Sequence, residues 1–466
     1  MKNILFSYPT LKDSNIPWIG SIPAHWGKVH GGAVLKQKRV SNRGLIENTV
    51  LSLSYGKIVV KPQEKLHGLV PESFETYQVV DPYDIIVRPT DLQNDWVTIR
   101  VGISFERGII TSAYICVRAL KPIKPEYAYL LLLAYDLKKI FYGMGSGLRQ
   151  NLDWSDFKRL PMLLPPSDEQ EKIALYIKYV DALVARFIQN RQSLIALLKE
   201  QKQAIINHAV TKGLNQNAKM KASGIDLLGD IPERWEVKPL KHFVKSNIET
   251  LTEKFDKNAT INYIDISTVG FGELKQEPVQ YVFKDAPSRA RRVIHTGDTI
   301  ISTVRTYLKS MCYVDDELDG CIVSTGFAVL TPSNNVFPEL LNYVLSADYF
   351  VNRVRQNSIG VSYPAISESR LIALKIAISP DIKEQQKILE YIRQKIKDID
   401  QAIERINKEI YLITEYRISL ISNVVTGKVD VRNIEVEDVL EEIEEDVESL
   451  GEETLEEEEI SVGEEG

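Results

Sequence analysis

The feature of this sequence that most constrains its fold is an internal repeat, in which motifs of the first half return in the second half. Six residues between positions 14 and 26 recur at a constant offset of 209 residues. They are Ser14, Ile16, Gly20, Ile22, Pro23 and Trp26, which return as Ser223, Ile225, Gly229, Ile231, Pro232 and Trp235. Self-similarity at a fixed spacing indicates one structural unit used twice. The sequence therefore predicts two halves of similar architecture.

The offset between matching residues changes along the chain. It rises to 213 where Pro125-Glu126 returns as Pro338-Glu339, and it then holds at 215 from Glu169-Gln170 to Thr211. A helix resists a change of length, because one inserted residue turns every following side chain by about 100°. We therefore predict, in each half, a module with loops of variable length followed by a helix of fixed length.

The two segments of fixed length, predicted as helices at 166–211 and 381–426, carry apolar residues at intervals of four and three. This spacing indicates a seam that packs against another helix, as in a coiled coil. The seam residues are Ile173, Ile177, Val180, Val184, Phe187, Leu194, Leu198 and Ile205 in the first helix, and Ile392, Ile396, Ile399, Ile403, Ile406, Ile410, Ile413 and Leu420 in the second. Arg191 and Arg417 interrupt the two seams. At 1.5 Å per residue, a helix of about 40 residues is roughly 60 Å long.

These helices could pair with each other or with those of a second copy of the chain. Two matched helices separated by a compact module favour pairing with each other, in antiparallel orientation, over a homodimer zipper. The positions expected to act as spacer or subunit-docking residues are Ile177, Val184, Leu194, Ile392, Ile399 and Ile406.

Each helix also has a predicted start signal. Ser167 with Gln170, and Asp381 with Glu384, have the spacing of a capping box. Glu169 and Glu384 would lie in the first helical turn, where the helix dipole favours negative charge. These two carboxylates are therefore interpreted as structural, although a matched pair of acids could also suggest catalysis.

The segments between the helices alternate short Val, Ile and Tyr runs with Gly, Pro and Asn turns, for example at 84–87 and 298–301. This pattern predicts mixed α/β modules with twisted sheets, and so an α+β chain. The expected boundaries are 1–165 for the first module, 166–211 for the first helix, 212–222 for a polar linker, 223–380 for the second module, 381–426 for the second helix and 427–466 for a C-terminal extension.

The net charge of −7 is unevenly distributed. The segment 435–466 has 17 acidic residues and no Lys or Arg, which leaves 57 basic against 47 acidic residues in 1–434, a net charge of +10. A basic body is compatible with nucleic-acid binding, and also with an ordinary soluble protein. The acidic segment has too few apolar residues to fold alone, so we expect disorder from 435 onward. It could be a solvated extension, it could compete with phosphate for the basic body, or it could dock a partner.

Motifs for chemistry are missing from the sequence. It has no Gly-x-x-x-x-Gly-Lys-Ser/Thr loop, and the string 81–84, Asp-Pro-Tyr-Asp, fits a turn better than the Asn/Asp-Pro-Pro-Tyr/Phe element that holds an extruded adenine. The six histidines have no metal-ligand spacing, and the three cysteines have no Cys-x-x-Cys pair. No apolar run is long enough to cross a membrane. We therefore expect a non-catalytic, metal-free protein of the cytoplasm.

The repeated tryptophans, Trp26 and Trp235, have two interpretations. An aromatic ring next to Ile-Pro could stack on a nucleic-acid base. We favour the other interpretation, in which each ring is a packing anchor that holds the entry segment of its module.

Three motifs together resemble the specificity-subunit family of Type I restriction–modification systems. Gly-x-Ile-Pro-x-x-Trp occurs at 20–26 and 229–235, Leu-Pro-Pro-Ser-Asp-Glu-Gln occurs at 164–170 with a weaker copy at 378–385, and Ala-Val-Thr-Lys-Gly-Leu ends the first helix at 209–214. The resemblance covers about residues 14–430. The second copy lacks the double proline and reads Val-Thr-Gly-Lys at 425–428, and the acidic segment is outside the family core.

The resemblance implies two mixed α/β target recognition domains, separated by two long antiparallel coiled-coil helices in a pseudo-two-fold repeat. Each domain would read one half of a bipartite, asymmetric site in double-stranded DNA. The helices would set the gap between half-sites and dock two adenine-methyltransferase subunits, and a restriction–translocation subunit would join them. No cofactor is expected on this chain, because the methyl donor, ATP and magnesium would be bound by those partners. The alternative is a non-enzymatic coiled-coil scaffold with two protein-binding modules.

Candidate DNA contacts are the basic, amide and aromatic residues placed near loops, because such groups reach phosphates and base edges. In the first module they are Lys38, Arg39, Arg43, Arg88, Arg149, Gln150 and Asn151. In the second module they are Arg289, Arg291, Arg292, Arg305, Tyr307, Ser362 and Tyr363. Each alone could be a solvated surface residue. The loops 145–152 and 360–366 align between the halves and precede the same helix, which makes them the stronger candidates.

Overall fold

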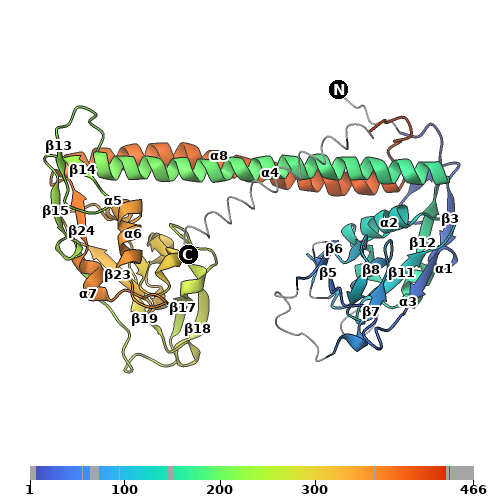
Figure 1. Ribbon diagram of the computed structural model, residues 1–466, viewed down its shortest axis with the longest axis horizontal. Helices are drawn as coiled ribbons and strands as arrows, with labels where there is room; N and C mark the ends of the chain where they lie inside the picture. Colours follow the sequence, from blue (N-terminus) through green and yellow to red (C-terminus); the bar gives the residue numbers. More distant parts are fainter. Residues whose placement is uncertain are drawn as a thin grey trace. The chain divides into compact units, whose positions relative to one another are not determined.

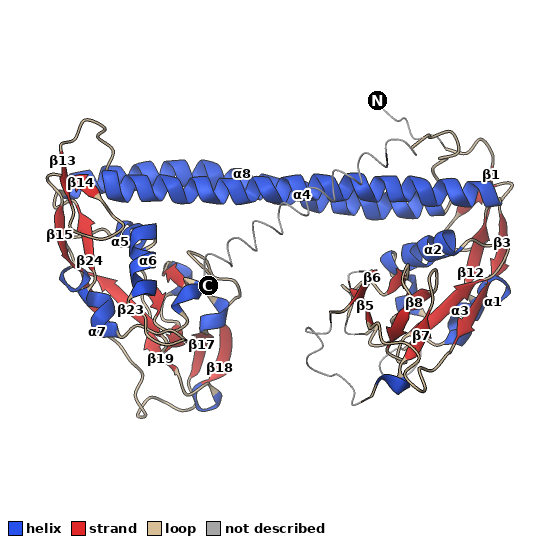
Figure 2. Ribbon diagram, viewed as in Figure 1, coloured by secondary structure: helices blue, strands red, loops and turns tan. Residues whose placement is uncertain are grey.

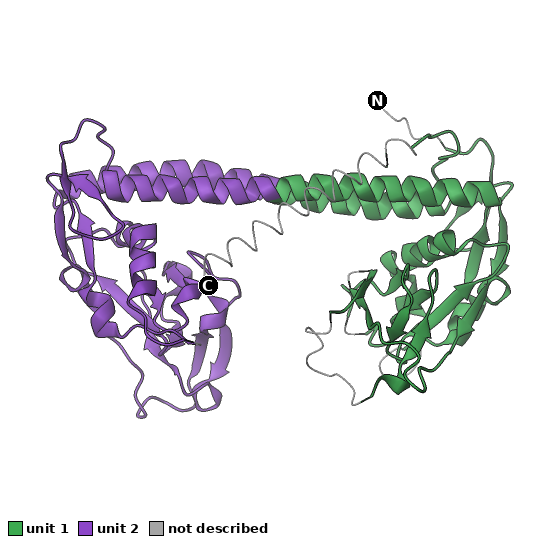
Figure 3. Ribbon diagram, viewed as in Figure 1, with its two compact units in different colours: residues 1–192, 407–466 green, residues 193–406 purple. Residues whose placement is uncertain are grey.

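The computed structural model describes residues 7–54, 56–62, 73–93, 95–144, 151–361, 363–436 and 440. It confirms the predicted fold class, with two mixed α/β modules and two long helices (Figure 1). The chain divides into two compact units, one of residues 1–192 with 407–466 and one of residues 193–406. Each unit contains one module and a part of both long helices (Figure 3).

The module of the first unit is built on an antiparallel sheet with the strand order β4-β11-β8-β9. These strands are β4 (Leu35–Lys38), β11 (Ile115–Ala119), β8 (Ile85–Val87) and β9 (Val101–Ile103). All residues of β8 and β9 are buried, and helix α2 (Pro125–Leu137) contacts β9 and β11. The other elements are β1 (Leu11–Asp13) with β2 (Ser21–Pro23), β3 (Gly27–His30) with β12 (Pro161–Leu164), β5 (Leu51–Ser54) with β6 (Lys57–Val60), β7 (Gln78–Val80) with β10 (Gly108–Ile110), α1 (Gly31–Val34) and α3 (Trp154–Arg159).

The module of the second unit has an antiparallel sheet with the strand order β16-β23-β20-β21. These strands are β16 (Val244–Ser246), β23 (Phe327–Pro332), β20 (Thr299–Ser302) and β21 (Met311–Tyr313). A second sheet has the order β18-β17-β22-β19, and the remaining elements complete the module (Figure 2). They are β18 (Val279–Val282), β17 (Thr260–Ile264), β22 (Ile322–Ser324), β19 (Ala290–Val293), β13 (Met220–Ala222) with β14 (Asp230–Pro232), β15 (Glu236–Pro239) with β24 (Lys375–Ile378), α5 (Pro338–Leu345), α6 (Asp348–Gln356) and α7 (Glu368–Ala373).

The two modules share one topology, which confirms the repeat at the level of strand pairing. The sheet β4-β11-β8-β9 corresponds to β16-β23-β20-β21, and the pair β3-β12 corresponds to β15-β24. The β7-β10 pair matches β19-β22, the outer part of the second sheet. The predicted polar linker ends inside this repeat, because its last three residues form β13, which pairs with β14 as β1 pairs with β2.

The two long helices are α4 (Ser167–Lys212) and α8 (Ile382–Val425). In the first unit, Asp181 of α4 accepts two hydrogen bonds, of 2.7 and 2.8 Å, from Arg417 of α8, and Arg191 lies 3.0 Å from Glu409. In the second unit, Lys202 of α4 lies 2.7 Å from Asp400 of α8. In these pairs the residue numbers increase along α4 while they decrease along α8, so the helices are antiparallel. Arg191 and Arg417, which interrupt the predicted seams, form ion pairs between the helices.

The predicted seam is buried at most of the spacer positions. Ile177 and Val184 of α4 and Ile392, Ile399 and Ile406 of α8 are all buried. Leu194 is the exception, because its side chain is 36% exposed and therefore lies at the margin of the seam. A straight α-helix drifts by about 20° per heptad from a strict seven-residue repeat, and this drift moves a regularly spaced residue off the contact line.

The C-terminal extension is packed against the first module where the structure describes it. Val431 and Val436 are buried in the main apolar core of that unit, and the backbone carbonyl of Arg432 accepts a hydrogen bond of 2.7 Å from Lys172. Disorder was expected from 435, but Glu435 and Val436 are described and Val436 is 4% exposed. Residues 437–439 and 441–466, which hold most of the acidic side chains of this extension, lie outside the described residues. Among those that are described, no helix combines the length and the apolar character needed to cross a membrane.

Candidate nucleic-acid interface

The first module is attached to the long helices through Trp26. Its indole N–H donates to Glu169, in the first turn of α4, at 2.8 Å, and the ring is fully buried. Tyr8 and His25 also contact the Glu169 carboxylate, at 3.1 and 2.6 Å. Gly427, just after α8, has a φ of 73°, and a Cβ there would lie 2.3 Å from the Pro23 side chain. The start of α4 and the end of α8 therefore meet at this ring.

The second module repeats the attachment at the other helix ends. Trp235 is 2% exposed and donates to Glu384, near the start of α8, at 3.3 Å. Gly213 follows α4, and a Cβ there would lie 3.4 Å from the Trp235 ring. The structure thus confirms both tryptophans as packing anchors. It also gives Glu169 and Glu384 a more specific role than contact with the helix dipole, since each accepts an indole N–H.

Gln170 and Glu384 do not close the capping boxes predicted with Ser167 and Asp381, and Glu384 accepts instead from the side chains of Trp235 and Ser379. The Gln170 amide donates to the Pro165 carbonyl at 2.9 Å and accepts from the Lys124 backbone N–H at 2.8 Å. Gln385 likewise donates to Ser379 at 2.8 Å and accepts from the Phe337 N–H at 3.3 Å. Both side chains therefore tie the last strand of a module to the start of α2 or α5, and so orient the module on the long helices.

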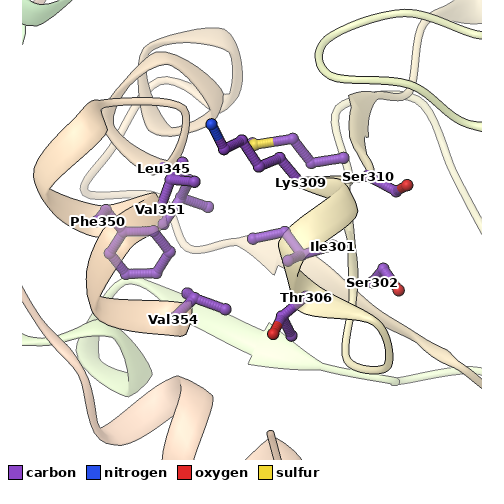
Figure 4. A pocket seen from close by; sticks show the side chains of 10 residues that line it. Ile301, Ser302, Thr306, Lys309, Ser310, Leu345, Phe350, Val351 and Val354 are labelled. Carbon is purple, nitrogen blue, oxygen red and sulfur yellow. The ribbon is translucent and has the colours of Figure 1, made fainter. Parts of the chain in front are cut away.

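The second module has an exposed edge formed by two loops, 303–310 and 358–366, which we call recognition edge 2. The loops are joined by hydrogen bonds from the Ile366 N–H to the Thr303 carbonyl at 2.9 Å and between the Thr306 and Ser358 hydroxyls at 2.7 Å. Behind the first loop lies a cavity of about 20 Å³, in which Ile301 faces Phe350 and neighbouring side chains of α6 (Figure 4). This volume holds about one water molecule. Apolar packing therefore supports the edge from behind.

Recognition edge 2 presents large side chains to solvent. The guanidinium of Arg305 lies 4.9 Å from the centre of the Tyr363 ring, and Arg305 has a left-handed backbone, with a φ of 50°. Tyr363 is 66% exposed, Tyr307 is 44% exposed and Leu308 is 47% exposed. Apolar and aromatic groups left in solvent beside a cation mark a contact surface. Tyr307, Tyr363 and Arg305, which were predicted as DNA contacts, are thus brought together, whereas Ser362 lies outside the described residues.

The first module has the matching recognition edge 1, formed by the loop 88–100 and the segment 151–152. The Leu152 N–H donates to the Pro89 carbonyl at 2.9 Å, and the Asp91 N–H donates to the Asn151 side chain at 3.1 Å. This pairing matches that of Ile366 with Thr303 in the other module. Trp96 is 54% exposed on the same loop. Asn151 therefore lies on recognition edge 1, and Arg149 and Gln150 lie outside the described residues.

A buried arginine holds the loop of recognition edge 1 in shape. Arg100 is fully buried, and its guanidinium donates to the carbonyls of Thr90 at 2.6 Å and Asp95 at 2.7 Å. It also donates to the Tyr142 hydroxyl at 3.1 Å. The backbone N–H of Arg100 donates to Asp136, whose pKa is raised to about 6 by burial. Buried polar groups need such partners, so the loop has little freedom to rearrange.

The remaining basic candidates of the first module differ in whether their side chains are already paired with carboxylates. Lys38 donates to Asp81 and Asp84 at 2.7 and 2.6 Å, and its side chain is 12% exposed. Its hydrogen bond helps to lower the pKa of Asp81 to about 2. Arg88 lies 3.3 Å from Asp95. The other two basic candidates, Arg39 and Arg43, are exposed, and their side chains make no hydrogen bond or ion pair with any residue that the structure describes.

The arginines near β19 in the second module also differ. Arg289 lies 2.8 Å from Asp265, and Arg291 lies 4.9 Å from the Phe283 ring centre. Arg292 is half-buried, and burial lowers its pKa. Its side chain forms no hydrogen bond or ion pair within the described part of the chain. As DNA contacts these residues stay predictions, and the Glu368 carboxylate acts on Arg292 only through its charge, which raises the pKa that burial lowers.

Sequence reasoning missed Trp96, Val97 and Arg100 as parts of recognition edge 1. Exposed apolar residues cannot be told from core residues by their type, and Val97 is 90% exposed. A cluster of three or more residues suited to hold a metal ion does not occur among the described residues.

Two modules of one topology, each with an exposed edge and each fixed by a tryptophan to the ends of the long helices, define a protein built by duplication. The chain belongs to the family described as the Type I restriction modification DNA specificity domain, whose model matches residues 86–197 and 232–412. It is a specificity subunit of a type I restriction–modification system, a component without catalytic activity of its own.

Similar proteins agree with this assignment. Over 363 residues the chain is 26% identical to the Type I restriction enzyme MjaVIII specificity subunit of Methanocaldococcus jannaschii. This match covers 75% of this chain and 82% of that protein. Over 176 residues it is 31% identical to the Type I restriction enzyme HindI specificity subunit of Haemophilus influenzae, covering 34% of this chain and 37% of that protein. A solved chain, from work on complex assembly and conformational transition of the type I R-M system, shares the fold at a TM-score of 0.56 and 17% identity, with 87% of this chain and 99% of that chain covered.

Proposed function

We propose that this specificity subunit recognises a bipartite, asymmetric site in double-stranded DNA, with one half-site read by each module. The observation that carries the proposal is the pair of recognition edges, which have the same hydrogen-bonded frame in both modules. The Leu152 to Pro89 bond in one edge matches the Ile366 to Thr303 bond in the other. The side chains on the two frames differ, with Trp96 on one and Arg305, Tyr307 and Tyr363 on the other, which supports two different half-sites.

The chemistry of the edges suits duplex DNA. Arginine donates to phosphate and to guanine, and apolar groups contact the thymine methyl group. An aromatic or aliphatic side chain can also be inserted between base steps. A guanidinium next to exposed tyrosines therefore supports DNA as the ligand more than it supports a peptide.

The same proposal gives the long helices two tasks. They set the gap between the half-sites, because α4 and α8 keep a fixed length while the loops of the modules vary in length. They also dock two adenine-methyltransferase subunits, and a restriction–translocation subunit joins the assembly in the cytoplasm. The methyl donor, ATP and magnesium then belong to those partners.

The test is co-expression of the chain with its methyltransferase, followed by methylation sequencing of the host DNA. We expect modified adenines in one split motif, with two defined parts separated by a fixed gap. An assembled complex that modifies no motif would contradict the proposal and would favour a protein-binding scaffold.

A further inference from the structure

A groove of about 500 Å³ opens beside recognition edge 1, and neither the edge nor the helix attachments account for it. Pro89 and Leu152, which join the two parts of the edge, form one side of the groove. The rest of its lining is mostly polar and aromatic, with the aliphatic residues Val40, Ala113 and Ile115 among it. The lining residues used below are Gln37, Arg39, Tyr77, Gln78, Tyr114 and Trp154.

One lining residue, Gln78, is held in a single orientation. Its amide nitrogen donates to the backbone carbonyls of Thr111 at 3.1 Å and Tyr114 at 2.7 Å. Carbonyl oxygens only accept hydrogen bonds, so the NH₂ group must face them. The amide oxygen of Gln78 accepts no hydrogen bond from any residue that the structure describes. Gln78 therefore offers the groove a fixed acceptor.

Two further lining residues are free to act as donors. Gln37 lies in β4 and Arg39 directly follows this strand, and alternate residues of an extended chain point to the same face. Gln37 is half-buried and Arg39 is exposed, and neither side chain has a hydrogen bond or ion pair within the described ranges. The half-buried rings of Tyr77, Tyr114 and Trp154 line the same groove. The groove thus combines a fixed acceptor, free donors and aromatic walls.

The second module has a different residue at the place of Gln78. Gln78 bridges to Ser41, just after β4, and Arg292 bridges to Thr250, just after β16. Gln78 lies on β7, which pairs with β10, and Arg292 lies on β19, which pairs with β22. Arg292 is therefore the counterpart of Gln78. An acceptor in one module is replaced by an arginine, which can only donate, in the other.

We propose that this shared strand position reads a base edge of the DNA, with Gln78 for the first half-site and Arg292 for the second. The proposal rests on the proposed function, which places DNA against the recognition edges. In the major groove, adenine and cytosine present an amino group, and guanine presents two acceptors. Gln78 therefore selects adenine or cytosine by accepting from the amino group, and Arg292 selects guanine by donating to it.

The test replaces the acceptor Gln78 by the donor that the second module has at this position. It uses the complete complex with the methyltransferase. Gln78→Arg converts the acceptor into a donor, and an arginine can still donate to the carbonyls that now hold the amide. We expect one position of the first half-site to change from adenine or cytosine toward guanine, while the second half-site stays the same. The preference for the original base should fall by roughly 5- to 150-fold, which corresponds to the discrimination of one good base contact. The readout is the methylated fraction of each site variant.

Two further variants keep the test decisive if Gln78→Arg unfolds the module. Arg39→Ala removes an exposed guanidinium at the groove without disturbing the core, and we expect weaker discrimination within the first half-site. Arg292→Gln should weaken the preference for guanine at one position of the second half-site. Gln216→Arg, on an exposed loop after α4, adds the same charge elsewhere and should change neither half-site.

The inference is overturned if folded Gln78→Arg and Arg39→Ala complexes methylate the wild-type motif with unchanged preference. It is equally overturned if the variants prevent assembly with the methyltransferase while the chain alone still binds its site, since the groove would then contact a protein. A wild-type complex that shows no split motif would remove the proposed function, and this inference with it.

Discussion

At the scale of single residues, each module depends on one indole ring that links it to both long helices. Trp235 donates to Glu384, near the start of α8, and its ring faces Gly213 at the end of α4. Removal of a buried ring leaves a cavity and a carboxylate without its donor. These anchors contribute to stability, and the recognition edges lie elsewhere in the modules.

Trp235→Ala should destabilise the second unit by about 3–5 kcal/mol, the usual cost of deleting a buried aromatic side chain. Chemical denaturation of the chain measures this loss. Trp18→Ala is the control, because Trp18 is 44% exposed and should cost much less. DNA half-sites should be unchanged in the folded variant. A Trp235→Ala protein with unchanged stability and lost discrimination would show that the ring contacts DNA.

Asp136 gives the first unit a specific dependence on pH. Its carboxyl is 1% exposed, and burial raises its pKa to about 6, above the value of about 3.9 expected in an unfolded chain. The folded state therefore binds this proton more tightly than the unfolded state. The contribution to stability is fully present below about pH 4 and is lost as the pH rises through about 6.

Asp136→Asn should reduce this loss of stability between pH 5 and pH 8. The amide keeps an acceptor for the Arg100 N–H and cannot ionise. We expect the fall in melting temperature across that range to shrink by roughly 2–5 °C, because only about one pKa unit of the shift, from pH 5 to about pH 6, falls within it and is worth on the order of 1.4 kcal/mol. Asp398→Asn, at an exposed position of α8, is the control. Equal pH profiles for wild type and Asp136→Asn would contradict the buried ionisation.

At the scale of elements, the long helices could be predicted from the sequence because their signal is local. The four-three spacing of apolar residues and the constant offset are visible without knowledge of the fold. The recognition edges could not be predicted in the same way, because the bond between Leu152 and Pro89 joins residues 63 positions apart. The roles of Glu169 and Gln170 were missed for the same reason, since their partners lie in distant segments.

The helix pair also allows a test of the proposed gap. One heptad inserted after Leu198 in α4, together with one after Ile403 in α8, keeps the seam in register, because seven residues make two turns of a coiled coil. The helices lengthen by about 10 Å. We expect the gap between half-sites to grow by about three base pairs, at 3.4 Å each, with both half-sites unchanged. Methylation sequencing gives both quantities. A changed half-site with the old gap would refute the spacer role.

At the scale of the whole molecule, the repeat is what the proposed recognition of two half-sites rests on. Both modules use one topology and one attachment to the helices. They differ in the side chains of the recognition edges and in Gln78 against Arg292. Because the attachment is common, each module should be able to work at either position of the chain.

The most direct test of two independent modules is a chain in which residues 11–164 are replaced by a copy of 220–378, with α4 and α8 left intact. The bounds follow the repeat, from β1 or β13 to the end of β12 or β24. The complex of this chain with the methyltransferase is analysed by methylation sequencing. We expect the second half-site of the wild-type motif to occur twice, on both sides of the original gap. An assembled complex that still requires the first half-site would contradict recognition of one half-site by each module.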